Sequence, residues 1–166
     1  MVLDIFFDGK IEILLPFKRT SSFEANSFVV SIDLKTNKYV EELNKKYKNK
    51  FLFIKCNITS KKSVIETSAQ IQKIFGNVSV LINNAALDSP PNAPKEETGP
   101  FESYPESSWD NVIDVNLKGV FNCCQVFGDI MAKNNKGSII NISSIYGVVS
   151  PDQSIYEYRR KIPGSR

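Results

Sequence analysis

From Ser27 onward, short apolar runs alternate with longer stretches in which apolar residues recur at helical spacing. Each short run is almost continuously apolar, which is typical of strands that helices cover on both faces of a parallel sheet. The runs predict strands at 28–32, 51–55, 78–82 and 138–142.

The stretches between these runs predict amphipathic helices. Apolar residues line one side of 38–48 and one side of 61–75, after which Gly76 supplies a stop signal. The longest helix is expected from about 108 to 134. Strands that alternate with helices indicate an α/β fold, here a doubly wound but incomplete sheet of about four parallel strands with flanking helices.

The two ends of the long helix carry local signals of their own. Ser107 and Asp110 have the spacing of a capping box, which predicts the start of the helix at this point. Lys136-Gly137 predicts its end.

The first 27 residues follow a different pattern. Asp8-Gly9 separates the apolar stretches 3–7 and 10–15, which is a strong local signal for a two-residue β-hairpin. The segment 88–106 holds five prolines and no periodicity, so we expect a surface loop of the length often found in functional lids. The chain is therefore divided into an atypical N-terminal segment, a partial α/β domain and a C-terminal tail, at 1–27, 28–150 and 151–166.

Composition excludes several classes of function. With 166 residues, 42% of them hydrophobic, the chain can build the core of one domain. A net charge of +3 from scattered charges favours a solvated surface over nucleic-acid binding. Histidine is absent, which excludes Ser-His-Asp hydrolysis and most zinc sites, and we expect no metal.

The cellular setting is read from the cysteines and the apolar runs. The three cysteines form no C-x-x-C pair, and the N-terminus carries no signal-like segment, so we expect a reduced, cytoplasmic protein. No apolar run approaches the ~20 residues of a membrane-spanning helix, so no membrane partner is expected.

Three motifs follow one another in the second half of the chain. Leu81-Ile82-Asn83-Asn84-Ala85-Ala86 resembles the Asn-Asn-Ala-Gly motif of the short-chain dehydrogenase/reductase family. The segment from Trp109 to Phe121 resembles the family's fourth-helix signature, and Gly137 to Ser144 resembles its fifth strand. The resemblance spans about Phe28 to Gly147 and implies a Rossmann-like domain that binds a nicotinamide dinucleotide.

The resemblance implies a cofactor site at the carboxyl ends of the strands. Asp33 stands where family members bind the adenosine ribose, and a carboxylate repels a 2'-phosphate, which favours NAD over NADP. Asn57 replaces an aspartate that faces the adenine amino group, whose hydrogen bond the amide oxygen can still accept, and Ile58 would border the adenine. For Asp33 alone, a strand-ending turn residue is the structural alternative.

The remaining candidates come from the other two motifs. Asn83, Ala85 and Ala86 complete the cofactor set, although two alanines after a strand can also reflect tight packing. The resemblance assigns Ser144 to the substrate carbonyl and Asn116 to a water that links the active-site lysine to solvent. Each also has a structural alternative. Ser144 could be a strand-end hydroxyl that bonds a nearby backbone group, and Asn116 a polar residue in a buried helix that must find partners.

Two parts of the family pattern are missing. Gly9 is the only glycine before Gly76, so no Gly-rich turn offers backbone amides to a pyrophosphate. No tyrosine and lysine share the Tyr-x-x-x-Lys spacing: Tyr156 is followed by Arg160, and an arginine cannot pass on a proton. We therefore expect a short-chain dehydrogenase/reductase-type, NAD-dependent oxidoreductase domain for a carbonyl or alcohol substrate that is inactive as this chain.

Other interpretations remain open. The chain could be a non-catalytic nucleotide-binding or protein-interaction module that need not bind a cofactor, and its unusual ends could belong to a gene fragment or a shifted reading frame. The apolar side of the long helix is expected to be partly exposed and to join copies in a homo-oligomer. It comprises Leu117, Val120, Cys124 and Phe127.

Overall fold

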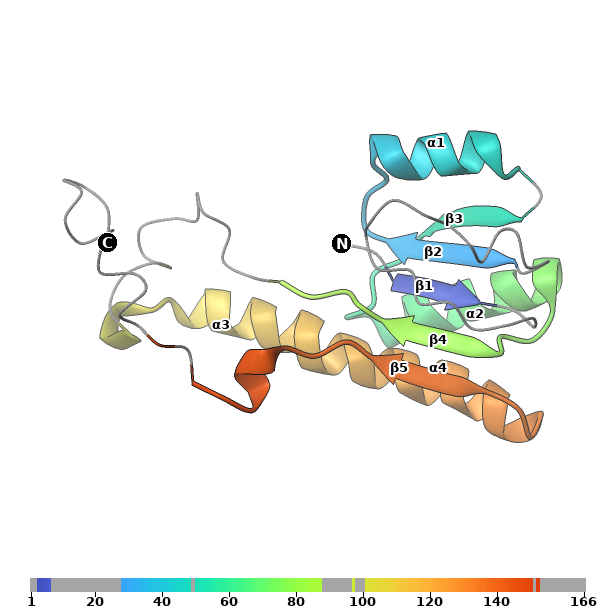
Figure 1. Cartoon of the computed structure of the whole chain (residues 1–166). Helices are drawn as coiled ribbons and strands as arrows, with labels where there is room; N and C mark the ends of the chain where they lie inside the picture. The colour runs from blue at the N-terminus through green and yellow to red at the C-terminus, as the bar shows by residue number, and fades with distance from the viewer. Residues whose placement is uncertain are drawn as a thin grey trace.

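Five strands form one sheet in the order β3-β2-β1-β4-β5 (Figure 1). The structure is a computed structural model and describes residues 28–48, 50–87, 97, 101–150 and 152, together with the backbone of 3–6. The strands are β1 (Leu3–Phe6), β2 (Val29–Asp33), β3 (Phe51–Lys55), β4 (Val80–Asn83) and β5 (Ser138–Asn141). The four strands predicted after residue 27 are confirmed to within two residues at either end.

Neighbouring strands pair in parallel in both halves of the sheet. β2 pairs with β3 so that Asp33 lies opposite Lys55, and β4 pairs with β5 so that Asn83 lies opposite Asn141. The helices that follow β2, β3 and β4 make the crossovers that parallel strands require. The predicted α/β fold with a doubly wound sheet is thereby confirmed.

The central strand β1 runs against its neighbours. It pairs antiparallel with β2 on one edge, Leu3 opposite Ile32, and antiparallel with β4 on the other, Asp4 opposite Ile82. The hairpin prediction was right about a strand at this place but wrong about its partner, because both edges of β1 are used by β2 and β4. The expected second hairpin strand, 10–15, lies outside the described residues.

Helices cover both faces of the sheet (Figure 1). On one face lies α1 (Lys38–Lys46), which starts where the Asn37 side chain accepts a hydrogen bond from the Val40 N–H. On the other face lie α2 (Lys61–Phe75) and the long helix. The predicted stop at Gly76 is confirmed: this residue has a φ of 85°, in the region that favours glycine.

The long helix is built from three consecutive pieces. These are α3 (Glu106–Ile113), a π-helical segment η4 (Asp114–Gly119) and α4 (Val120–Lys133). Its start differs from the prediction: Pro105 is the N-cap and no side chain caps the helix, so Ser107 forms no capping box. Proline fits because the first helical N–H groups need no partner within the helix and its φ suits a helix start.

The C-terminal end of α4 lies before Lys136-Gly137. Asn135 adopts a φ of 50°, its N–H donates to the Ala132 carbonyl, and the Lys136 N–H donates to the Met131 carbonyl. This pair of bonds is a Schellman ending, in which a left-handed residue closes the last helical turn. Asparagine takes the role that the sequence had suggested for the glycine.

The two faces of the sheet enclose separate apolar clusters. The larger one packs beneath α2 and α4 and includes Ile32, Ile71, Leu81 and Phe127, whereas the smaller one beneath α1 consists of buried Val29, Val40, Phe51 and Ile82. Phe127 is fully buried, so its placement on the exposed side of the long helix was wrong; Leu117 on that side is 62% exposed. In the described ranges, no helix has both the length and the apolar character needed to cross a bilayer.

Candidate functional site

The carboxyl ends of β2, β3, β4 and β5 meet along one edge of the sheet, called here the carboxyl edge. They do so because β1 is antiparallel to both β2 and β4, so these two strands and their parallel partners all point the same way. Ligands of doubly wound sheets bind at such an edge. The residues that follow these strands therefore form the candidate site.

Asp33 and the residues after β3 lie side by side on this edge. The Asp33 carbonyl accepts a hydrogen bond from the Cys56 N–H at 2.9 Å, which joins the ends of β2 and β3. The Asp33 carboxylate accepts one from the Leu34 N–H at 2.6 Å. Asp33 is half-buried, so part of its side chain is held by the protein and part is accessible to solvent.

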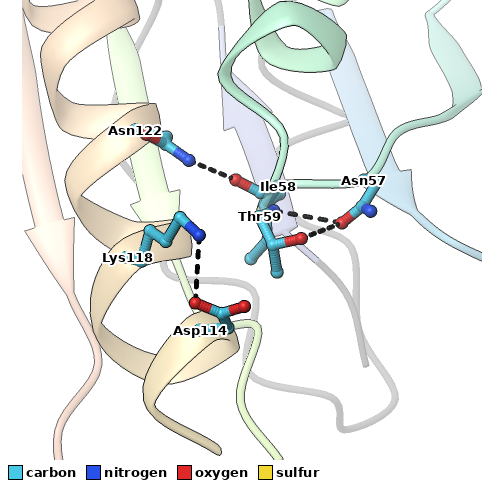
Figure 2. Close-up of polar contacts among 6 residues, drawn as sticks. All are labelled: Asn57, Ile58, Thr59, Asp114, Lys118 and Asn122. Carbon is cyan, nitrogen blue, oxygen red and sulfur yellow. Dashed lines mark hydrogen bonds and ion pairs between the residues drawn. The ribbon is translucent and has the colours of Figure 1, made fainter. Parts of the chain in front are cut away.

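The β3–α2 loop, residues 56–60, is organised by the Asn57 side chain. Its Oδ1 accepts hydrogen bonds from the Thr59 N–H at 3.0 Å and from the Thr59 hydroxyl at 2.9 Å (Figure 2). The Asn57 N–H donates to the Ser63 hydroxyl at 3.0 Å. Ser60 then caps α2 by accepting from the Ser63 N–H. These bonds fix the loop against the first turn of α2.

The long helix holds the same loop from the other side. Buried Asn122, 5% exposed, donates from Nδ2 to the Ile58 carbonyl at 2.9 Å (Figure 2). One helical turn earlier, a Cβ on Gly119 would lie 2.6 Å from the Ile58 Cδ1, so a larger residue there would displace the Ile58 side chain. The long helix therefore contacts Ile58 at both its carbonyl and its side chain, and Ile58 is buried in the larger core cluster.

Asn83 uses its side chain to join strands. Its Nδ2 donates to the Asn141 Oδ1 at 2.8 Å and contacts the Cys124 Sγ at 3.2 Å. Its buried Oδ1 has no hydrogen-bond partner among the described residues. The amide therefore ties β4 to β5 and α4, and any contact with a cofactor would come from the backbone that follows it.

The Ala-Ala segment after Asn83 is held by Asn116. In η4, Asn116 accepts from the Leu87 N–H at 2.7 Å and donates to the Leu87 carbonyl at 3.0 Å. Ala85 packs against the larger core cluster and Ala86 is exposed. Both the oxygen and the nitrogen of the Asn116 side chain have protein partners, which favours a structural role over the binding of a water molecule. π-Helical turns such as η4 often occur at functional sites.

Ser144 follows β5 on the same edge. The Ile142 N–H donates to the Asn83 carbonyl at 2.9 Å, so Ser144 lies two residues beyond a direct link to the β4 end. Its Oγ accepts from the Tyr146 N–H at 3.2 Å and caps the short helix Ile145–Gly147. The side chain is exposed, and its hydroxyl hydrogen can still be donated.

The sequence reasoning missed the residues that support the β3–α2 loop, namely Thr59, Gly119 and Asn122. Gly119 stood inside a recognised motif but had no assigned role. Asn122 carried a signal, since it is an amide in a helix otherwise rich in apolar residues, and a buried amide must find a partner. Its partner, the Ile58 carbonyl, lies 64 residues away in sequence.

Cys123 is not suited to act as a nucleophile. Burial, together with the neighbouring thiols of Cys56 and Cys124, raises the pKa of Cys123 to about 12. A thiol with such a pKa stays protonated at neutral pH and is a poor nucleophile. In the described part of the chain, no cluster of three metal-binding side chains exists either.

A groove of about 590 Å³ lies between α2 and α4, on the face of the sheet that these two helices cover. Its walls carry Lys61, Ile65, Gln72 and Lys133. Lys133 is paired with Asp129 at 2.7 Å, one turn earlier on the same exposed surface. The described residues that line it come from α2, α4 and Asn134 and from no strand end, so the groove is separate from the carboxyl edge.

The chain is similar in sequence to known proteins. A family model described as short chain dehydrogenase matches residues 19–157. The 3-oxoacyl-[acyl-carrier-protein] reductase FabG of Staphylococcus epidermidis is 36% identical over 123 residues, 74% of this chain and 47% of the relative. Sorbose reductase SOU1 of Candida albicans is 30% identical over 109 residues, 66% of this chain and 37% of the relative.

Solved structures are similar as well. ElxO with NADP bound has 27% identity and a TM-score of 0.61 over 75% of this chain and 48% of its own. NAD+-bound xylitol dehydrogenase has 25% identity and a TM-score of 0.61 over 72% of this chain and 44% of its own. The chain spans about half the length of the first relatives that it matches.

Proposed function

Because the chain belongs to the short-chain dehydrogenase family of oxidoreductases, we propose that it carries the adenosine half of a nicotinamide dinucleotide site and that this chain alone does not transfer hydride. The direction of β1 carries the proposal. The carboxyl end of β1, Phe6, lies beside Val29 and Val80, at the edge of the sheet opposite to Asp33 and Asn83.

The adenosine end of the cofactor fits the residues present. Asp33 offers a carboxylate oxygen to ribose hydroxyls, and the β3–α2 loop, held rigid by the bonds of Asn57 and of the buried Ile58, offers a wall for the base. The side chains of Ala85 and Ala86 are small, so they leave space for a flat ligand after β4. These positions stay predictions, and the geometry of the loop is what supports them.

The diphosphate end does not fit. A pyrophosphate needs backbone N–H groups at a helix start, reached through a Gly-rich turn after a strand whose carboxyl end lies at the ligand edge. Here the strand between β2 and β4 points the other way, and Gly9 is the only glycine before Gly76. We therefore assign no phosphate contact to this chain.

The reactive end is also incomplete. A bound nicotinamide cofactor would supply the hydride, and Ser144 would hydrogen-bond the carbonyl or alcohol oxygen of a substrate. Tyr156 and Arg160 stand at the spacing of a proton-donating tyrosine and its lysine, but arginine stays protonated and cannot relay a proton. Any reaction by the whole protein therefore needs groups beyond those assigned here.

Asp33 supports a preference for NAD over NADP. A 2'-phosphate placed against its carboxylate would bring two negative charges together, whereas a 2'-hydroxyl would donate a hydrogen bond. The relatives whose structures hold NADP or NAD+ leave this choice open for the chain.

Calorimetric titration tests the proposal. AMP should bind weakly, with a dissociation constant on the order of 1 mM, about 4 kcal/mol. Asp33→Asn should weaken AMP by about tenfold, since a hydrogen bond to a charged acceptor is lost. A control, Lys136→Ala at the opposite edge of the sheet, should not. Binding of AMP that is the same in Asp33→Asn and wild type, or NADH oxidation that Ser144→Ala abolishes, would contradict the proposal.

A second role is supported by exposed apolar residues of the long helix. Leu117 and Phe121 are 62% and 60% exposed and lie four residues apart on one side. We propose that copies of the chain associate through this side. Sedimentation should show concentration-dependent dimers that Phe121→Glu removes; a monomeric wild-type chain at all concentrations would contradict it.

A further inference from the structure

The Asn57 carboxamide has a fixed orientation. The Thr59 backbone N–H can only donate, so the atom that faces it at 3.0 Å must be the amide oxygen. The Thr59 hydroxyl occupies the second lone pair of that oxygen at 2.9 Å. The amide nitrogen is consequently turned away from Thr59, as Figure 2 shows.

The surrounding contacts keep this orientation. The Asn57 N–H is bound to the Ser63 hydroxyl, and the next carbonyl, that of Ile58, is bound to buried Asn122. A shift of the loop would break these bonds and move the Ile58 side chain out of the space beside Gly119 that it fills. Rotation of the amide by itself would set the Asn57 NH₂ against the Thr59 N–H, donor against donor.

Asn57 therefore offers a ligand a donor and no acceptor. Its side chain is exposed, and the hydrogen bonds recorded for its carboxamide within the described residues are both to Oδ1. The 6-amino group of adenine is itself a donor, so it gains nothing from this nitrogen, whereas the 6-oxo group of hypoxanthine can accept from it. An aspartate at position 57 would have a second carboxylate oxygen, which could accept a hydrogen bond from the adenine 6-amino group while the first oxygen bonds Thr59.

We propose that Asn57 makes the base site permissive: it binds a purine nucleotide without selecting the 6-amino group, so that 6-oxopurine nucleotides bind as well as adenine nucleotides. This inference rests on the proposed adenosine site. It differs from the expectation drawn from the sequence, in which the Asn57 oxygen accepts the adenine amino group, because Thr59 already uses both lone pairs of that oxygen.

Paired titrations with AMP and IMP test it, since the two ligands share the ribose and the phosphate. The wild-type chain should bind them with dissociation constants within about threefold of each other, and any difference should favour IMP, whose 6-oxo group can accept from Asn57. Asn57→Asp keeps one oxygen for Thr59 and turns the other towards the base, and should favour AMP by about tenfold, as expected for a charged acceptor. Any effect of its charge on the phosphate cancels in the ratio.

Asp33→Asn is the matched control, because it should weaken both ligands alike and leave the AMP-to-IMP ratio unchanged. Melting temperatures of all three proteins verify folding. A wild-type preference for AMP beyond about threefold would overturn the inference while the adenosine site stands. The same AMP-to-IMP ratio in wild type and Asn57→Asp would also overturn it. Failure of both ligands to bind would overturn the inference together with the proposed function.

Discussion

Replacing Asn122 by alanine should unfasten the β3–α2 loop from the long helix. Asn122 is buried, and its Nδ2 supplies the hydrogen bond that the structure records for the Ile58 carbonyl, at 2.9 Å. The substitution removes the donor but leaves the carbonyl where water reaches it poorly, because Ile58 is only 8% exposed.

The magnitude follows from that burial. A buried carbonyl left without a donor costs about 1–3 kcal/mol, and the small void at the amide adds to it. We expect a loss of about 2 kcal/mol in the free energy of unfolding, or roughly 4–8 °C in Tm for a domain of this size. AMP affinity should fall as well, since Asn57 and Ile58 belong to the proposed base site.

Urea unfolding followed by circular dichroism measures the loss, with Gln125→Ala as the control. Gln125 lies on the same helix, three residues later, and is exposed, so its substitution should change stability by less than about 0.5 kcal/mol. If Asn122→Ala and Gln125→Ala are equally stable, the bond to the Ile58 carbonyl contributes nothing and the loop is held by other means.

Three further outcomes are expected. Phe127→Ala should cost about 3–5 kcal/mol by urea unfolding, because the ring is fully buried, while exposed Phe121→Ala should cost less than about 1 kcal/mol; equal losses would contradict the assignment of the core. The pKa of Cys123, raised from 9.0 to about 12, means that the unfolded chain loses this proton first, so stability is full below pH 9 and falls between pH 9 and 12. Cys123→Ala should be less sensitive to pH across that range, and an unchanged slope would refute the shift. For β1, NMR should detect short Hα–Hα contacts with β2, which antiparallel pairs make and parallel pairs lack.

The repeating part of the fold could be predicted from the sequence because its signals are local. Continuous apolar runs gave the strands and Gly76 gave the end of α2, since a strand between two helical layers and a left-handed cap each demand particular residue types. The placement of Asp33, Asn83 and Ser144 on one edge followed as soon as the strands were parallel.

The rest depended on contacts between distant residues. An apolar stretch such as Leu3–Phe6 predicts a strand, but its direction is decided by the two strands on either side of it. Likewise, helical spacing groups Phe127 with Leu117, while only the packed structure decides which of them faces the sheet. The hydrogen bonds from Thr59 to Asn57 are local and could have been predicted. The family motif instead suggested that the Asn57 oxygen accepts from a ligand, so the neighbouring Thr59 was not considered.

The central claim is that the chain carries the adenosine half of a dinucleotide site but no binding site for the diphosphate. Comparing the affinities of AMP and NAD at the same salt concentration tests this claim directly. With β1 antiparallel, the described residues offer the second phosphate no helix start that follows a central strand at the carboxyl edge, so NAD should bind no more than about threefold more tightly than AMP. NAD binding more than about thirtyfold tighter than AMP would mean that a diphosphate cradle exists, and would contradict the account.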